Sequence, residues 1–318
     1  MTEELSPEDQ LRLNVLLAQE IRAVRIDESS LVLHALLDGG EEASLPLHPN
    51  GRADKYLRLV REALSGHALG SPGGYPVYLS RWTRHGQMES SNLNQLLLIG
   101  EPEAVIAVVH SPALTDQVAE YAWWAMPTIE NARLMLAREA VARGHMGPIL
   151  ADFLVEHLAF LQEDHLTIMD TVAVLLASGT LSTAQSEAVW KRGKRQNSYY
   201  VAFLELRPDN LPLTPGSQAA GDDAQEQTFI QACTEILSRP DTQEVVSRTL
   251  DAIGQYFAGA DQATDSPPAL ARQRLARVNS GMTDAIFARS SAIGSLMRRK
   301  IEPVVSPILA DLAVLQAH

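Results

Sequence analysis

Apolar positions near the start of the chain follow a helical spacing. Leu13, Leu16, Leu17 and Ile21 recur every three to four residues, as on the buried side of a helix. The preceding segment 6–9 has a capping serine, a proline and two acids, which is typical of a helix start. The pattern therefore predicts a first helix that begins near residue 7 and includes Ile21.

After Asp27 the pattern changes to that of strands. Residues 30–36 are dense in Leu and Val, 38–40 read Asp-Gly-Gly, and 43–47 partly alternate between apolar and polar. This predicts a β-hairpin whose second strand lies at a sheet edge, because Pro46 has no N–H to donate. A helix over about 53–64, a glycine-rich loop over 66–74 and a third strand over 75–82 complete this region.

Residues 92–206 alternate short apolar-periodic stretches with single Gly or Pro breakers. Thr115, Thr128 and Ser182 stand at expected helix starts, and Ser182 with Gln185 has the spacing of a capping box. We expect helices that pack in pairs, as in a small solenoid. No fixed repeat period is present, so the pattern does not identify a repeat family.

The segment 213–227 is rich in Pro, Gly, Ser, Ala and acids, and predicts a linker. It divides the chain into an N-terminal domain, 1–212, and a C-terminal helical bundle, 228–318. In the bundle we expect helices over about 225–237, from a cap at Asp241 to Phe257, and two more that Pro303 and Pro307 break. The predicted fold class is mainly α, with a small antiparallel hairpin or three-stranded sheet near the N-terminus.

Composition places the chain among globular proteins, with 46% hydrophobic and 20% charged residues over 318 positions. The first ten residues are acidic and lack a signal-peptide pattern, and no apolar run is long enough to span a bilayer. We therefore expect a soluble, cytoplasmic protein with no membrane partner. Cys233 is the single cysteine and is expected to be a buried structural residue, since its neighbours are apolar or uncharged apart from Glu235.

Charge is distributed unevenly along a chain whose net charge is −13. Residues 222–265 contain nine acids against two arginines, whereas residues 269–302 contain seven bases against two acids. The simpler explanation is that the two segments pair within one domain, and the alternative is a basic docking surface. The net charge itself disfavours non-specific binding to nucleic acid.

Motifs for chemistry are few. The glycine-rich segment 66–74 lacks the Gly-Lys-Ser/Thr ending of a phosphate-binding loop and leads into a strand pattern, so it is expected to be structural. Acids and histidines gather over 152–170, but without a Glu-x-x-His or His-Glu-x-x-His spacing. No Gly-x-Ser-x-Gly motif occurs. We expect no metal, no cofactor and no catalytic residue.

Aromatic and basic residues gather in three places, which define the candidate interaction surface. Adjacent residues of a helix diverge by about 100°, so Trp123 and Trp124 cannot share one core-facing stripe. Trp, Tyr and Arg dominate protein interfaces and also stack on bases. Packing anchors between domains are the alternative. The candidate residues are Arg81, Trp82, Arg84, His85, Trp123, Trp124, Lys191, Arg192, Arg195, Tyr199 and Tyr200.

Three strings carry a resemblance to a known family: SPGGYPVYLSRWTR at 71–84 with Gly86–Met88 after it, GEPEAV at 100–105 and AWWAMPT at 122–128. With them, residues 20–212 resemble the DsrS proteins, which are encoded with the dissimilatory sulfite reductase machinery of sulfur-oxidising bacteria. The resemblance implies a cytoplasmic accessory or regulatory role in the oxidation of stored sulfur. It assigns no catalytic residues.

The first functional hypothesis is therefore a non-catalytic interaction protein with a protein partner. A second is an enzyme that uses the loop region Gly66–Arg84, with His67 and His85. A third is an RNA-binding regulator that uses Lys191–Tyr200 and the C-terminal arginines. Convergence of polar groups in a closed pocket would favour the enzyme, and a steep salt dependence of binding would favour RNA.

Overall fold

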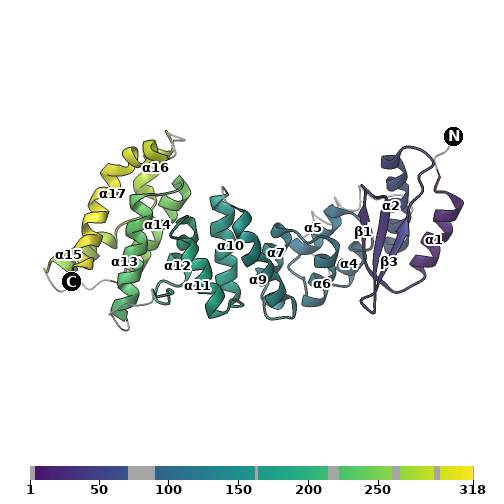
Figure 1. The fold of residues 1–318 in the computed structure, drawn as a ribbon, viewed down its shortest axis with the longest axis horizontal. Helices are drawn as coiled ribbons and strands as arrows, with labels where there is room; N and C mark the ends of the chain where they lie inside the picture. Colours follow the sequence, from purple (N-terminus) through teal and green to yellow (C-terminus); the bar gives the residue numbers. More distant parts are fainter. Residues whose placement is uncertain are drawn as a thin grey trace. The chain divides into compact units, whose positions relative to one another are not determined.

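The computed structural model describes residues 4–70, 90–161, 164–213, 222–259, 266–289 and 294–317. The fold is mainly α-helical with a small antiparallel sheet near the N-terminus, as predicted (Figure 1). Internal packing divides the chain into two compact units, unit 1 (Met1–Leu154) and unit 2 (Val155–His318). Each unit is described by itself.

The division differs from the predicted boundary at 213–227. In unit 2, helix α12 (Ser198–Leu206) packs against both α10 (His165–Ser178) and α14 (Gln243–Tyr256). Arg248 on α14 donates to Glu205 at 2.6 Å and to Asp170 at 3.0 Å. Because the packing and these ion pairs join α10 and α12 to α14, residues 155–212 belong with the C-terminal helices.

Helix α1 (Pro7–Leu17) begins as predicted. The Ser6 hydroxyl accepts a hydrogen bond from the Asp9 N–H at 3.1 Å, and Pro7 occupies the first turn. The predicted end is wrong, because Ile21 begins strand β1 (Ile21–Asp27). Residues 21–27 read equally well as a strand, since Val24 and Ile26 turn to one face and Ala23 and Arg25 to the other.

Strands β2 (Val32–Leu37) and β3 (Glu42–Pro46) form the predicted hairpin. The sheet order is β1-β2-β3, both pairs antiparallel, so Pro46 lies on an edge strand as expected. The third strand of the described sheet is β1. The predicted strand over 75–82 lies outside the described residues.

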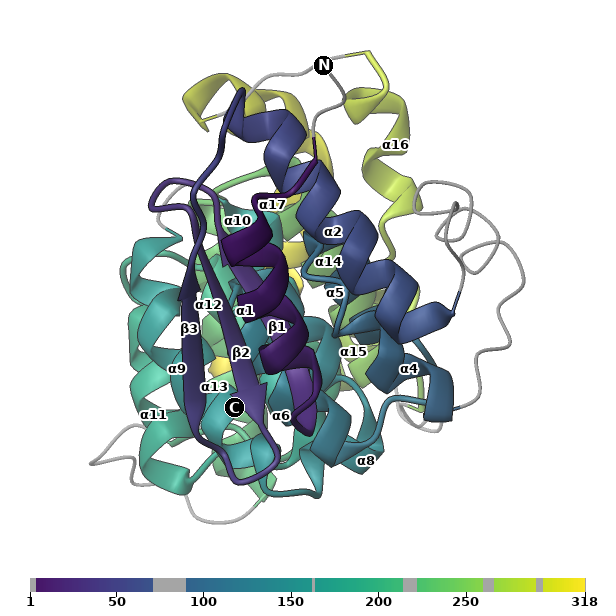
Figure 2. The ribbon, with the colours of Figure 1, turned by 90° about the vertical axis from the view of Figure 1, so that its right-hand side faces the viewer.

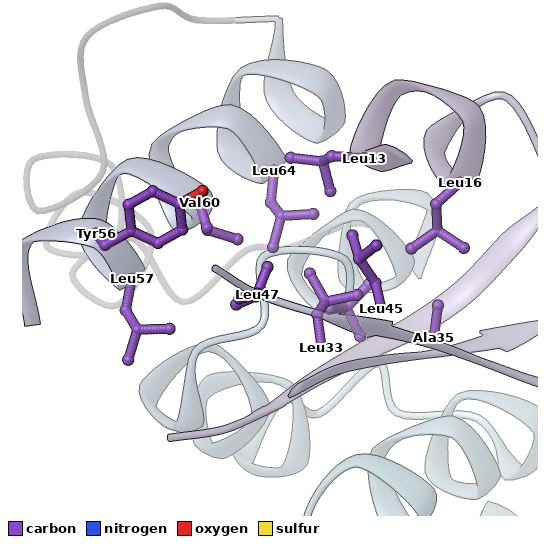
Figure 3. Close-up of a cluster of buried hydrophobic side chains, with 11 residues drawn as sticks. Leu13, Leu16, Leu33, Ala35, Leu45, Leu47, Tyr56, Leu57, Val60 and Leu64 are labelled. Atoms are coloured by element: carbon purple, nitrogen blue, oxygen red, sulfur yellow. The ribbon is translucent and has the colours of Figure 1, made fainter. Parts of the chain in front are cut away.

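One face of this sheet carries a core that α1 and α2 (Ala53–Leu69) cover (Figure 2). Figure 3 shows the leucines of both helices pointing at the side chains of the strands. The cluster comprises Leu13, Leu16, Val24, Leu33, Ala35, Leu45, Leu47, Tyr56, Leu57, Val60 and Leu64. Helix α2 runs beyond the predicted end, so 66–69 are helical, and Gly70 terminates it with a φ of +65°.

The other helices of unit 1 follow the predicted alternation of apolar stretches and breakers. Thr115 and Thr128 are confirmed as caps, because each hydroxyl accepts from the N–H three residues on. The Val24 N–H of β1 donates to the Leu97 carbonyl at 2.8 Å, which ties the sheet to the helical part of unit 1. These helices are α4 (Ser90–Leu96), α5 (Pro102–His110), α6 (Asp116–Ala125), α7 (Ile129–Leu136), α8 (Glu139–Ala142) and α9 (Met146–His157), whose last three residues fall in unit 2.

Unit 2 contains a short 3-10 turn, η1 (Leu158–Phe160), and eight described helices. The capping box of Ser182 and Gln185 is confirmed at the start of α11. Cys233 on α13 is fully buried, as expected, and burial raises the pKa of its thiol. Besides α10, α12 and α14, the helices are α11 (Thr183–Arg192), α13 (Asp222–Ser238), α15 (Pro267–Leu275), α16 (Gly281–Phe287) and α17 (Gly294–Gln316).

Three predictions for the C-terminal helices are corrected. Helix α13 begins at Asp222, inside the predicted linker. The cap of α14 is Thr242, whose hydroxyl accepts from the Val245 N–H, and not Asp241. Helix α17 runs unbroken through Pro303 and Pro307, because a stripe of side chains from Met297 to Leu315 is buried along it and holds it against α13 and α15.

Among the described residues, no helix is both long enough and apolar enough to span a bilayer.

Candidate interaction surface

Helix α6 lies against β1, on the face of the sheet opposite the core of Figure 3 (Figure 1). It ends with the adjacent residues Trp123 and Trp124, and both are half-buried. Trp123 packs edge-to-face on Phe153 of α9, with ring centroids 4.7 Å apart and planes at 78°. Trp124 points to the sheet, so the two rings diverge as the helical geometry requires.

Trp124 forms a three-residue contact with Arg25 and Glu42, which we call the Trp124 cluster. The indole Nε1 donates to Glu42 Oε1 at 2.6 Å. The guanidinium carbon of Arg25 lies 4.5 Å from the ring centroid, and its Nη2 donates to Glu42 Oε2 at 3.2 Å. Each member therefore touches the other two, by a hydrogen bond, a cation–π contact or an ion pair.

The sheet register explains why these side chains meet. Ala23 pairs with Leu36, which pairs with Glu42, so Glu42 stands diagonally across from Arg25 on the same face. Arg25 also donates through Nη1 to the Trp124 carbonyl at 3.2 Å. This carbonyl belongs to the last turn of α6, where the backbone lacks helical partners and a positive charge is favourable.

The cluster is held in place and yet presented to solvent. The side chains of Arg25 and Glu42 remain 38% and 45% exposed. Interface anchors are most often Trp and Arg side chains, and an anchor that is already ordered loses less side-chain entropy on binding. The Trp124 cluster can therefore offer a planar guanidinium, a carboxylate and part of an indole ring to a partner.

Sequence reasoning found Trp124 but missed Arg25 and Glu42. A signal was present, since Arg25 stands between Val24 and Ile26, which face the core, and therefore points to the opposite face of the strand. The other basic-aromatic candidates of unit 1, Arg81, Trp82, Arg84 and His85, lie outside the described residues.

The basic run at the end of α11 separates into exposed and packed members. Lys191 and Arg195 are exposed, and Lys191 lies 3.8 Å from Glu187 on its own helix. Arg192 is half-buried, donates to the Val155 carbonyl at 3.3 Å and lies 5.9 Å from the Tyr199 ring. Arg192 therefore has a packing role inside unit 2.

Tyr199 and Tyr200 are core residues, which corrects their place in the predicted surface. Their exposed fractions are 4% and 3%. The Tyr199 hydroxyl donates to the Leu158 carbonyl at 2.8 Å, and the Tyr200 ring lies 4.3 Å from Trp190. Residues 198–204 of α12 are all buried, so the helix has no outward face there. Neither ring is presented for stacking on a nucleic-acid base.

Comparison of the sequence and the structure with known proteins identifies no relative of this chain. The chain matches no protein-family model, no curated protein and no solved structure. The resemblance to DsrS thus stays a prediction.

The acidic and basic segments of the C-terminal region pair in part. Arg272 donates to Glu226 at 2.7 Å, and Arg274 pairs with Asp311. Arg277, Arg289, Arg298 and Arg299 are exposed and make no ion pair with any other residue that the structure describes. Internal pairing therefore accounts for only part of the basic segment.

Ser198, His165 and Asp241 meet at the start of α12 and have the residue types of a hydrolytic triad. Their geometry differs from one, because the Ser198 hydroxyl at 3.3 Å and Asp241 Oδ2 at 3.6 Å both approach the same nitrogen, His165 Nδ1. Ser198 is also fully buried. Asp241 accepts from the Ser198 N–H at 3.3 Å, so it caps α12. The group is a structural cap.

The acids and histidines of 152–170 do not converge either. Asp164 caps α10 by accepting from the Thr167 N–H at 3.0 Å. Within the described ranges, no group of three or more His, Cys, Asp or Glu side chains has the geometry to hold a metal ion.

Proposed function

We propose that this chain is a cytoplasmic, non-catalytic accessory protein that binds a protein partner through the Trp124 cluster. The observation that carries the proposal is the cluster itself. Two side chains of interface type, Trp124 and Arg25, are fixed together with Glu42 by mutual contacts on a half-exposed face. Mutual contacts of this kind order an anchor before binding.

The biological setting comes from the resemblance to DsrS and is part of the same proposal. On that basis the partner belongs to the machinery that oxidises stored sulfur, and the chain regulates or assists it. The acidic net charge of −13 favours a partner with a basic surface around its binding site.

The proposal is tested in a sulfur-oxidising bacterium that carries the gene. The chromosomal copy is deleted, or replaced by the Arg25→Ala variant, and the rate at which stored sulfur disappears is measured. Arg58→Ala is the matched control, because Arg58 pairs with Glu62 at 3.0 Å on the exposed side of α2, away from the cluster.

We expect the deletion and Arg25→Ala to slow sulfur consumption, and Arg58→Ala to leave it unchanged. Protein levels are measured alongside, since losing an exposed cation–π contact and ion pair costs only about 1 kcal/mol of stability. A deletion strain that oxidises sulfur normally would reject the sulfur role. Equal effects of Arg25→Ala and Arg58→Ala would reject the cluster as the binding surface.

A further inference from the structure

Unit 2 contains an open pocket of about 540 Å³ that lies between α13 and the α11–α12 turn. One wall is a face of α13, where Gln231, Thr234, Glu235 and Ser238 recur at helical spacing. The opposite wall comes from Gly193 and the residues that follow it. Every residue that lines the pocket is polar, charged or glycine, so the pocket suits a ligand with little apolar surface.

Three cations stand around this pocket: Lys194, Arg195 and Arg239. All three are exposed, and none forms an ion pair with another residue in the described parts of the chain. The lining also includes the carboxylates of Glu235 and Asp241, so the three cations leave the pocket with a net charge of +1 in a chain whose net charge is −13, and this local excess of positive charge favours an anion.

A buried acceptor lies in the same pocket. Asn197 is only 8% exposed, and its Nδ2 donates to the Arg239 carbonyl at 2.7 Å, which fixes the orientation of the amide. Its Oδ1 is buried and receives no hydrogen bond from any residue that the structure describes. An unsatisfied buried acceptor costs about 1–3 kcal/mol, and because Oδ1 has almost no exposed area, a ligand hydroxyl reaches it only after the Asn197 side chain shifts.

The pocket wall at Gly193 rests on the ring of Tyr200. A Cβ at Gly193 would come within 2.3 Å of the Tyr200 ring, so only glycine lets this backbone lie on the ring. Burial and the neighbouring Glu235 carboxylate raise the pKa of Tyr200 to about 12. Gln231 donates to Glu235 at 3.0 Å from the other side. Glu235 is therefore an oriented acceptor at the pocket.

We propose that this pocket binds a small phosphorylated sugar or polyol. Its phosphate would lie at Arg239, Lys194 and Arg195, because guanidinium and ammonium groups are the preferred partners of phosphate oxygens. Its hydroxyls would donate to the Glu235 carboxylate. The site is separate from the Trp124 cluster and is independent of the function proposed above.

Isothermal titration calorimetry on the full chain tests this site with glucose 6-phosphate and glycerol 3-phosphate. Glucose and inorganic phosphate are titrated separately, because each supplies only half of the proposed contacts. Arg239→Gln removes one pocket cation, and its backbone carbonyl stays to accept from Asn197. Lys191→Gln is the matched control, since Lys191 is a similarly exposed cation on α11 that does not line the pocket.

We expect at least one phosphorylated probe to bind about tenfold or more tightly than either half-probe. Arg239→Gln should weaken this binding by about tenfold, as loss of a charge-assisted contact does, and Lys191→Gln should not change it. The proposal is overturned if neither phosphorylated probe binds at millimolar concentration, or if inorganic phosphate binds as tightly as the phosphorylated probe. Equal losses in the two variants would indicate diffuse attraction of anions and would also overturn it.

Discussion

Among the described glycines of unit 2, Gly254 on α14 is the one where an added methyl group would meet a backbone atom at the shortest distance. A Cβ at this residue would lie 1.9 Å from the Val278 carbonyl oxygen and 3.1 Å from its carbon. The obstacle is backbone, which cannot rotate away as a side chain can. For Gly254→Ala we therefore expect a packing cost at the upper end of the usual range for overpacked sites, about 3 kcal/mol.

The helix itself partly offsets this cost. Replacing glycine by alanine inside a helix contributes about 1 kcal/mol in favour of folding, so the net loss is about 2 kcal/mol. Urea unfolding followed by circular dichroism measures it. Gly259→Ala is the control in the same unit, because nothing lies within 4 Å of a Cβ there and the change should stay within about 0.5 kcal/mol. A Gly254→Ala variant as stable as the parent would refute the close approach of α14 to Val278.

Two further predictions concern buried titratable groups. Asp9 is 1% exposed and accepts from the Tyr56 hydroxyl at 2.6 Å and the His48 N–H at 2.7 Å. Burial raises its pKa, but the hydrogen bonds from His48 and Tyr56 outweigh burial and hold the pKa below the usual value. Its stabilisation is thus present above about pH 4 and is lost as the pH falls below that value. Asp9→Asn should destabilise the protein by about 1–3 kcal/mol at neutral pH. The urea concentration at the unfolding midpoint should also fall less steeply between pH 6 and pH 3 in this variant than in the parent. An equally steep fall in both proteins would contradict this role of Asp9. Cys233 should not react with a thiol reagent at neutral pH until urea unfolds unit 2, because burial raises the pKa of its thiol. Rapid labelling of the native protein would show that the Cys233 side chain is not buried.

Local signals predicted much of this fold. Ser6, Thr115, Thr128 and Ser182 each cap a helix as expected, because a capping hydrogen bond spans three residues and can be read from neighbouring positions. The hairpin was predictable for the same reason, since its turn and its alternation are both local.

Features that depend on distant residues were not predictable. Ile21 fits a helix by spacing and a strand by alternation, and only its pairing with β2 decides between them. Pro303 and Pro307 normally end helices, yet packing along α17 outweighs the loss of two backbone hydrogen bonds. The ion pairs of Arg248 likewise could not be read from the sequence, because its partners lie 43 and 78 positions away.

The candidate site shows the same limit. Adjacent tryptophans on a helix must diverge, so the sequence indicated that one ring leaves the core. It could not indicate that Trp124 meets Glu42, which is 82 positions away. Tyr199 and Tyr200 next to a basic run resembled a stacking surface, but residues 198–204 of α12 are all buried. Exposure is a tertiary property that composition does not fix.

Photo-crosslinking next to the Trp124 cluster tests the proposed partner surface most directly. A photoreactive amino acid replaces Ser44, an exposed residue on β3 that shares its sheet face with Glu42, or Glu62 on α2 as the control position. Irradiation in the native host should give one crosslinked species of defined mass from position 44 and none from position 62, and adding Arg25→Ala should abolish it. The same products from both positions, or a position-44 product that persists with Arg25→Ala, would contradict binding through the Trp124 cluster.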